Sequence, residues 1–155
     1  MNDIIPYIQS YSNKNLNIIM NTISYVFNLP IYCVIILLLF MYKIIRIEQV
    51  AFIIIGYYII KIIKNIVKRE RPYITNRNVI LLDNNSFDRY SFPSGHTFFA
   101  FILSFILEHN IGYSLGVIPY IVAFSRMYLG AHHSTDLLGG YIVAKLIATY
   151  GLSKY

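Results

Sequence analysis

The first half of the chain contains an uninterrupted apolar run, Val34-Ile35-Ile36-Leu37-Leu38-Leu39-Phe40-Met41. It lies within a longer stretch, residues 16–42, that contains no charged residue. About 20 consecutive, mainly apolar residues are enough for a helix to cross the hydrocarbon core of a membrane. The stretch therefore predicts a helical membrane protein. Its first part carries Asn17, Asn21 and Ser24 among apolar residues, which indicates an amphipathic helix at the membrane interface that ends near Pro30.

The composition of the whole chain agrees with a membrane protein. The 155 residues are 57% hydrophobic and 13% charged, whereas a soluble domain carries about 25% charged residues. The length suits a single domain covering residues 1–155. The alternative is a soluble helical protein with an unusually apolar core. The single cysteine, Cys33, excludes an intrachain disulfide.

The net charge of +6 suits anionic lipid headgroups or an anionic substrate as partners. It does not favour nucleic-acid binding, because the one basic cluster, residues 68–71, closes a hydrophobic segment. The sequence indicates no oligomeric state.

Five apolar segments with turn signals between them predict helices at residues 30–47, 48–69, 94–107, 112–128 and 133–152. We therefore expect an all-α integral-membrane helical bundle, with about five transmembrane helices and an N-terminal amphipathic helix. Six spans are the alternative. Gly112 and Gly116 have the spacing of a helix-packing pair, and Gly139-Gly140 would allow a neighbouring element to approach closely.

Three polar groups interrupt the apolar segments. They are Lys64 with Arg71-Pro72, then Pro93-Ser94-Gly95-His96, and then Ser125-Arg126 with His132 and Asp136. Ionisable residues near a membrane are costly to place and mark function by default. The first group ends one predicted helix, the second begins the next, and the third joins the last two. If consecutive helices run antiparallel, all three groups lie on one side of the membrane.

These residue types suit phosphoryl transfer. Lys64, Arg71 and Arg126 supply positive charge for phosphate oxygens. His132 and Asp136 are four residues apart, on one face of a helix. The carboxylate can accept a hydrogen bond from one imidazole nitrogen, which leaves the other nitrogen free to act as a nucleophile.

The second polar group adds an anion site and a second histidine. Ser94 and Gly95 stand where a helix begins, and the free N–H groups of a helix N-terminus bind phosphate. His96 could protonate a leaving group. Each residue also has a structural explanation of its own: the cations could anchor helix ends at the interface, and His96 and Asp136 could favour helix N-termini.

Taken together, the three groups resemble the signature motifs of the type 2 phosphatidic acid phosphatase superfamily, which also includes vanadium haloperoxidases and bacterial class A acid phosphatases. The first motif is Lys, six residues, then Arg-Pro. The second is Pro-Ser-Gly-His. The third is Ser-Arg, five residues, His, three residues, then Asp. All three occur here in order and with their internal spacing.

The resemblance implies a role for each motif residue. His132 is the nucleophile that forms a phosphohistidine, Asp136 orients it, and His96 protonates the leaving group and then activates water. The phosphoryl oxygens are held by Lys64, Arg71, Ser94, Gly95 and Arg126. The resemblance implies neither a metal nor an organic cofactor.

The resemblance also implies an activity and a location. The expected protein is a multi-pass membrane enzyme that hydrolyses a lipid phosphate or pyrophosphate, with its site on the extracytoplasmic or lumenal face. The basic residues near the site do not themselves favour that orientation. A polyprenyl diphosphate is the preferred substrate by analogy, with phosphatidate-like lipids as alternatives. A haloperoxidase-like oxidase and a non-catalytic membrane scaffold are the other functions considered.

Overall fold

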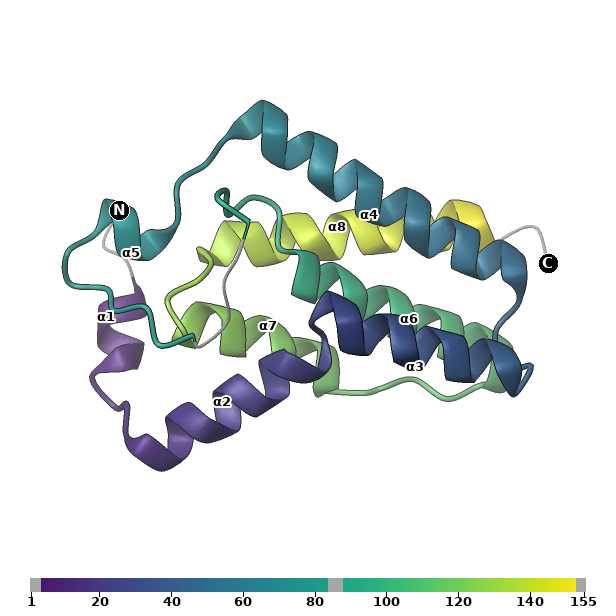
Figure 1. Cartoon of the computed structure of the whole chain (residues 1–155), viewed down its shortest axis with the longest axis horizontal. Helices are drawn as coiled ribbons and strands as arrows, with labels where there is room; N and C mark the ends of the chain where they lie inside the picture. The colour runs from purple at the N-terminus through teal and green to yellow at the C-terminus, as the bar shows by residue number, and fades with distance from the viewer. Residues whose placement is uncertain (1–3, 84–87, 153–155) are drawn as a thin grey trace.

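The computed structural model describes residues 4–83 and 88–152. These residues form helices and no strand, as the all-α prediction requires (Figure 1). The helices are α1 (Ile4–Gln9), α2 (Lys14–Val26), α3 (Leu29–Met41), α4 (Ile47–Val67), α5 (Pro72–Thr75), α6 (Gly95–Ile111), α7 (Ile118–Tyr128) and α8 (Ser134–Leu152).

The central helix is α6, which packs against α4, α7 and α8. Residues Phe98 to Leu103 of α6 are all buried. A helix that is hydrophobic all round belongs in the interior of a bundle. In Figure 1, α4, α8, α6 and α3 extend along the long axis, and α1, α2 and α5 lie towards one end. Helix α6 therefore packs against each of the helices that end or begin at the sequence motifs, and it positions those helix ends relative to one another.

Two predicted helices are shorter in the structure than the sequence indicated. The helix expected at residues 30–47 ends at Met41, where Lys43 has a left-handed φ of 57°. The helix expected at residues 112–128 begins only at Ile118. Gly112 and Gly116 have φ values of 69° and 54°, and a Cβ atom on either would meet nothing within 4 Å. The prediction that they form a packing pair was therefore wrong; they are turn residues.

The count of membrane spans differs from the expected five. Within the described part of the chain, one helical segment, Ile47–Thr75, is long and apolar enough to cross a membrane. Helices α2 and α3 meet the same criterion as a pair, with a bend of 52° between them. Helices α3, α6 and α7 have 13, 17 and 11 residues, fewer than the roughly 20 that a helix needs to span the bilayer alone. Helix α8 has 19 residues but is not among the candidate segments.

Several large apolar side chains nevertheless point outwards from α3 and α4. Leu37 and Ile62 are 56% and 57% exposed, respectively, and Val34 and Ile54 are similar. Large apolar side chains exposed on neighbouring helices are typical of a surface that contacts protein or membrane.

Candidate active site

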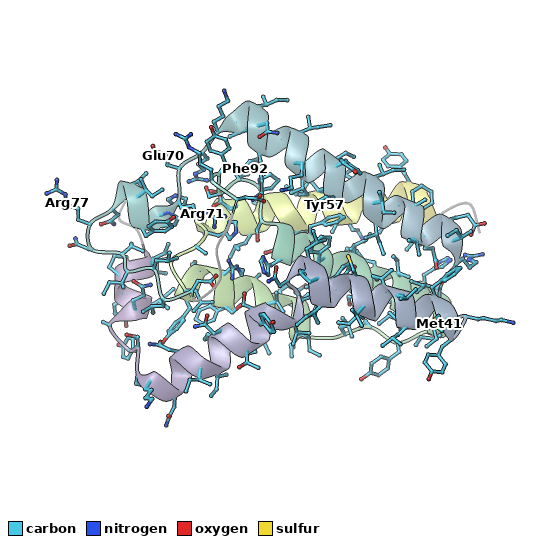
Figure 2. All side chains as sticks on the ribbon, in the orientation of Figure 1. Met41, Tyr57, Glu70, Arg71, Arg77 and Phe92 are labelled. Atoms are coloured by element: carbon cyan, nitrogen blue, oxygen red, sulfur yellow. The ribbon has the colours of Figure 1, made fainter. Side chains whose placement is uncertain are left out.

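The first motif lies where α4 ends. Lys64 occupies the last turn of α4 and is 5% exposed, and its Nζ donates a hydrogen bond to the Tyr90 carbonyl (3.0 Å). Lys68 ends the helix with a left-handed φ of 51°, so that the chain turns inward before Arg71. Figure 2 labels Arg71 between α5 and the start of α8. Arg71 is 2% exposed, and its Nη1 donates to the Ala131 carbonyl at 2.9 Å, which connects the first motif to the third.

The second motif begins α6. Ser94 is the N-cap residue, and its Oγ accepts hydrogen bonds from the Thr97 hydroxyl (3.0 Å) and the Thr97 amide (3.4 Å). The Ser94 amide donates to the Asp136 carbonyl at 2.9 Å, which connects this motif to α8. A Cβ atom on Gly140 of α8 would lie 2.4 Å from the Ser94 carbonyl oxygen. The expected close approach at Gly140 is therefore present, and its neighbour is Ser94 of the second motif.

The third motif joins α7 to α8. Arg126 lies in the last turn of α7, and its carbonyl accepts hydrogen bonds from the amides of Ala131 and His132. These bonds fold the loop back onto the helix end. His132 and Asp136 are 2% and 0% exposed, and His132 Nδ1 lies 3.5 Å from Asp136 Oδ2. The imidazole thus lies beside the carboxylate, although among the described residues Nδ1 forms no hydrogen bond and His132 lies two residues before the first residue of α8.

The three motifs meet at one cavity of about 350 Å³. Six of the eight predicted site residues line it: Lys64, Arg71, Gly95, His96, Arg126 and His132. Asp136 stands behind His132, where an orienting residue belongs. Ser94 is fully buried beside Thr97 and is not part of the lining. The structure therefore offers the Gly95 end of the helix to a phosphate, rather than the Ser94 hydroxyl.

The environment of His132 favours its neutral form. Burial is the largest cause that lowers the pKa of His132 well below its ordinary value of 6.5, and the positive charges of Arg71, Arg126 and Lys64 act in the same direction. A neutral imidazole has an unshared electron pair on one nitrogen. His132 thus has a nitrogen lone pair available at neutral pH.

Three further charged residues contact the site and were missed by the sequence analysis. Asp83 forms a buried ion pair with Arg126 (2.5 Å). Arg69 Nη1 donates to Asp136 Oδ1 (2.9 Å) and also contacts the Thr135 hydroxyl. Asp88 lines the cavity and pairs with Lys61 and Lys64. None of these positions belongs to a motif. The sequence signalled them only by their charge, at the end of the helix predicted at residues 48–69 or between it and the helix predicted at 94–107.

A comparison with protein families matches residues 46–154 to the PAP2 superfamily. The chain belongs to the PAP2 superfamily. The matched range contains all three motifs and every predicted site residue. The family expected from the motifs is therefore confirmed.

Curated relatives are similar over part of their length. The chain is 36% identical over 81 residues to the "Putative undecaprenyl-diphosphatase YbjG" of Escherichia coli, covering 50% of this chain and 40% of that protein. It is 34% identical over 101 residues to "Phosphatidylglycerophosphatase B" of Bacillus subtilis, covering 56% and 46%. The matches thus extend over less than half the length of these relatives.

Two solved structures share the fold. The crystal structure of Aquifex aeolicus LpxE has a TM-score of 0.81 at 22% identity, covering 98% of this chain and 93% of that one. The first transmembrane PAP2 type phosphatidylglycerolphosphate phosphatase from Bacillus subtilis has a TM-score of 0.70 at 23% identity, covering 94% and 81%. The helical arrangement is therefore that of transmembrane PAP2 proteins.

Proposed function

We propose that this PAP2 chain is a membrane lipid phosphatase that hydrolyses a phosphomonoester or a diphosphate through a phosphohistidine. The observation that carries the proposal is the placement of His132. It is buried, it faces the Asp136 carboxylate, and it shares one cavity with Lys64, Arg71 and Arg126. The names of the relatives, an undecaprenyl-diphosphatase and a phosphatidylglycerophosphatase, support a lipid substrate.

In the first step, the imidazole nitrogen of His132 that faces away from Asp136 attacks phosphorus. The bond between phosphorus and the leaving oxygen breaks, and His96, on the same cavity wall, gives that oxygen a proton that it takes up together with the anionic phosphate group. Asp136 stabilises the positive charge that develops on the His132 ring. The three cations stabilise the charge on the phosphoryl oxygens.

In the second step, water attacks the phosphohistidine. His96, now neutral, takes a proton from the water, the bond between phosphorus and nitrogen breaks, and inorganic phosphate leaves. The residue that acted as an acid in the first step acts as a base in the second. Both steps use only residues of the cavity and the adjoining Asp136.

An apolar cavity beside the site supports a lipid substrate. It has a volume of about 500 Å³, lies between α3 and α4, and shares Leu29, Tyr57 and Phe99 with the polar cavity. A phosphate at His132 could therefore continue into a hydrocarbon tail along α3 and α4. We place these helices in the bilayer as part of a multi-pass arrangement, with the site on the extracytoplasmic or lumenal face.

The proposal is tested by phosphate release from lipids in detergent, with EDTA present. The substrates are phosphatidate, phosphatidylglycerophosphate and a polyprenyl diphosphate. We expect release that survives EDTA and falls about 1,000-fold or more in His132→Ala, because the nucleophile is lost. Acid-labile phosphate trapped on the wild-type protein, and absent from the variant, would identify the phosphohistidine.

Folded wild-type protein that releases phosphate from none of these lipids would overturn the proposal. Release that is equal in the wild type and His132→Ala would overturn the phosphohistidine mechanism.

A further inference from the structure

One lysine in the cavity has no role in the proposed reaction. Lys61 lies three residues before Lys64 on α4 and lines the same cavity. Its Nζ is 2.7 Å from Asp88 Oδ1, while Lys64 Nζ is 3.3 Å from Asp88 Oδ2. A single carboxylate therefore bridges two lysines. The Lys64 side chain is 6% exposed and that of Lys61 is 38% exposed, so Lys61 stands nearer the mouth of the cavity.

Asp88 is ionised and fixed at this position. Burial alone would raise the pKa of Asp88, but the hydrogen bond from Lys61 and the charges of Lys64 and Lys61 outweigh it and lower the pKa. The Asp88 carbonyl accepts hydrogen bonds from Arg71 Nε and Nη2 at 2.9 and 2.7 Å. The backbone is thus held independently of the side chain. The Asp88 carboxylate therefore already provides a negative charge between the two lysines, in the cavity where the motif residues are proposed to bind phosphate.

Lys61 also lies on the side of the polar cavity that adjoins the apolar cavity between α3 and α4. Its Nζ is 5.6 Å from the centre of the Tyr57 ring, and Tyr57 lines both the polar and the apolar cavity. In a lipid diphosphate, the non-transferred phosphoryl group lies between the terminal phosphoryl group and the tail. With the terminal group at His132 and the tail along α3 and α4, the other group falls beside Lys61.

We propose that Lys61 binds the non-transferred phosphoryl group of a lipid diphosphate, and that this group displaces the Asp88 carboxylate from Lys61. A substrate with one phosphoryl group leaves the pair between Lys61 and Asp88 in place. Lys61 is then the residue that determines the preference for diphosphates over monophosphates. This inference rests on the proposed lipid phosphatase activity and specifies its substrate class.

The test compares a polyprenyl diphosphate and a polyprenyl monophosphate with the same tail. The measured quantity is kcat/KM for the diphosphate divided by kcat/KM for the monophosphate. We expect Lys61→Gln to lower this ratio about 10- to 100-fold, the scale of one or two charge-assisted hydrogen bonds, mainly through a higher KM for the diphosphate. Asp88→Asn keeps the carbonyl that Arg71 contacts and removes the competing charge, so we expect the ratio to rise.

The matched control is Lys68→Gln, which removes the same charge from an exposed residue at the end of α4 that does not line the cavity. Its ratio should equal that of the wild type. An equal effect of Lys61→Gln on both substrates would overturn the role of Lys61, as would a wild type that hydrolyses only the monophosphate. A fall of the ratio in Asp88→Asn would overturn the role given to Asp88. Folded wild-type protein inactive on every lipid would instead refute the phosphatase activity itself.

Discussion

The two oxygens of Asp136 have different partners. Oδ2 faces His132 Nδ1 and accepts a hydrogen bond from the His133 amide (2.8 Å), while Oδ1 accepts one from Arg69 Nη1 (2.9 Å). A fully buried carboxylate is stable as an anion only when it is paired and hydrogen-bonded. Arg69 therefore holds the Asp136 side chain in its position beside His132. In the proposed reaction Arg69 acts on His132 through Asp136 and not through the substrate, because Arg69 does not line the cavity.

We predict that Arg69→Gln lowers kcat roughly 10-fold, the scale of one charge-assisted hydrogen bond, and changes KM little. Arg69→Lys should restore part of the loss, because it returns the charge without the planar guanidinium. Steady-state kinetics on the best lipid substrate provide both constants, with Lys68→Gln as the neighbouring control. A higher KM at unchanged kcat would contradict this role and would place Arg69 among the substrate-binding residues.

At this scale, the sequence analysis found the residues whose spacing is fixed along the chain. His132 and Asp136 could be paired from their separation of four residues, which would place them together on a helix; in the structure His132 lies just before α8 and still reaches Asp136. Arg69, Asp83 and Asp88 could not be found in the same way, since their partners Asp136, Arg126 and Lys61 lie 67, 43 and 27 residues away in the sequence. Such pairs depend on the tertiary arrangement of α4, α7 and α8.

Among the helices, the contact between α6 and α8 matters most for the site. It joins the start of α6, with the second motif, to the first half of α8, with Asp136. The approach is close because Gly140 has no side chain at the point where α8 meets the Ser94 carbonyl. Gly139 beside it faces the ring of Phe92, which Figure 2 labels near the start of α8. The two glycines thus face different kinds of neighbour.

We predict that Gly140→Ala destabilises the protein by about 1–3 kcal/mol, the usual cost of overpacking, because its Cβ would meet backbone that cannot rotate away. Gly139→Ala serves as the matched variant. Its Cβ would lie 2.7 Å from the Phe92 ring, which can shift, and alanine favours the helix by up to about 1 kcal/mol. Thermal unfolding in detergent should show the lower Tm for Gly140→Ala. Equal Tm values would contradict the difference between the two contacts.

Helix positions followed from the sequence more closely than helix lengths. The helix predicted at residues 48–69 corresponds to α4 and that at 133–152 to α8, since both are long apolar segments bounded by polar residues. Helices α3 and α7 are shorter than predicted because Lys43, Gly112 and Gly116 adopt left-handed backbone conformations. For Lys43, residue type gives no such signal. For the two glycines, their spacing matched a packing motif equally well.

Across the whole molecule, the helix directions place the site at one end of the helical bundle. The end of α4, the start of α6, the end of α7 and the start of α8 all face towards the α5 end in Figure 1. At the other end, Asn110 of α6 donates a hydrogen bond to the Ile44 carbonyl (2.8 Å) and bonds to Gln49 of α4. If the helices lie in a bilayer, these two ends face opposite sides of it.

Cysteine labelling can determine which side the site faces. The only native cysteine, Cys33, is exposed on α3, so Cys33→Ser gives a background without thiols. Arg77→Cys would report the site end, where Figure 2 shows Arg77 pointing away from the molecule. Tyr113→Cys would report the other end, because Tyr113 follows α6 and is 67% exposed. We predict that a membrane-impermeant maleimide labels Arg77→Cys in intact cells and labels Tyr113→Cys only after permeabilisation.

A lipid phosphate whose tail stays in the bilayer brings its headgroup to one face only, so the cavity must open at the face where the substrate is presented. The reverse labelling pattern would place the cavity at the cytoplasmic face. The positive-inside rule would then explain the basic residues at positions 68–77, because basic residues beside a membrane helix favour that face. Labelling of both positions from the same side of the membrane would mean that α6, the helix between them, does not cross the bilayer, and would contradict the multi-pass arrangement proposed for the chain.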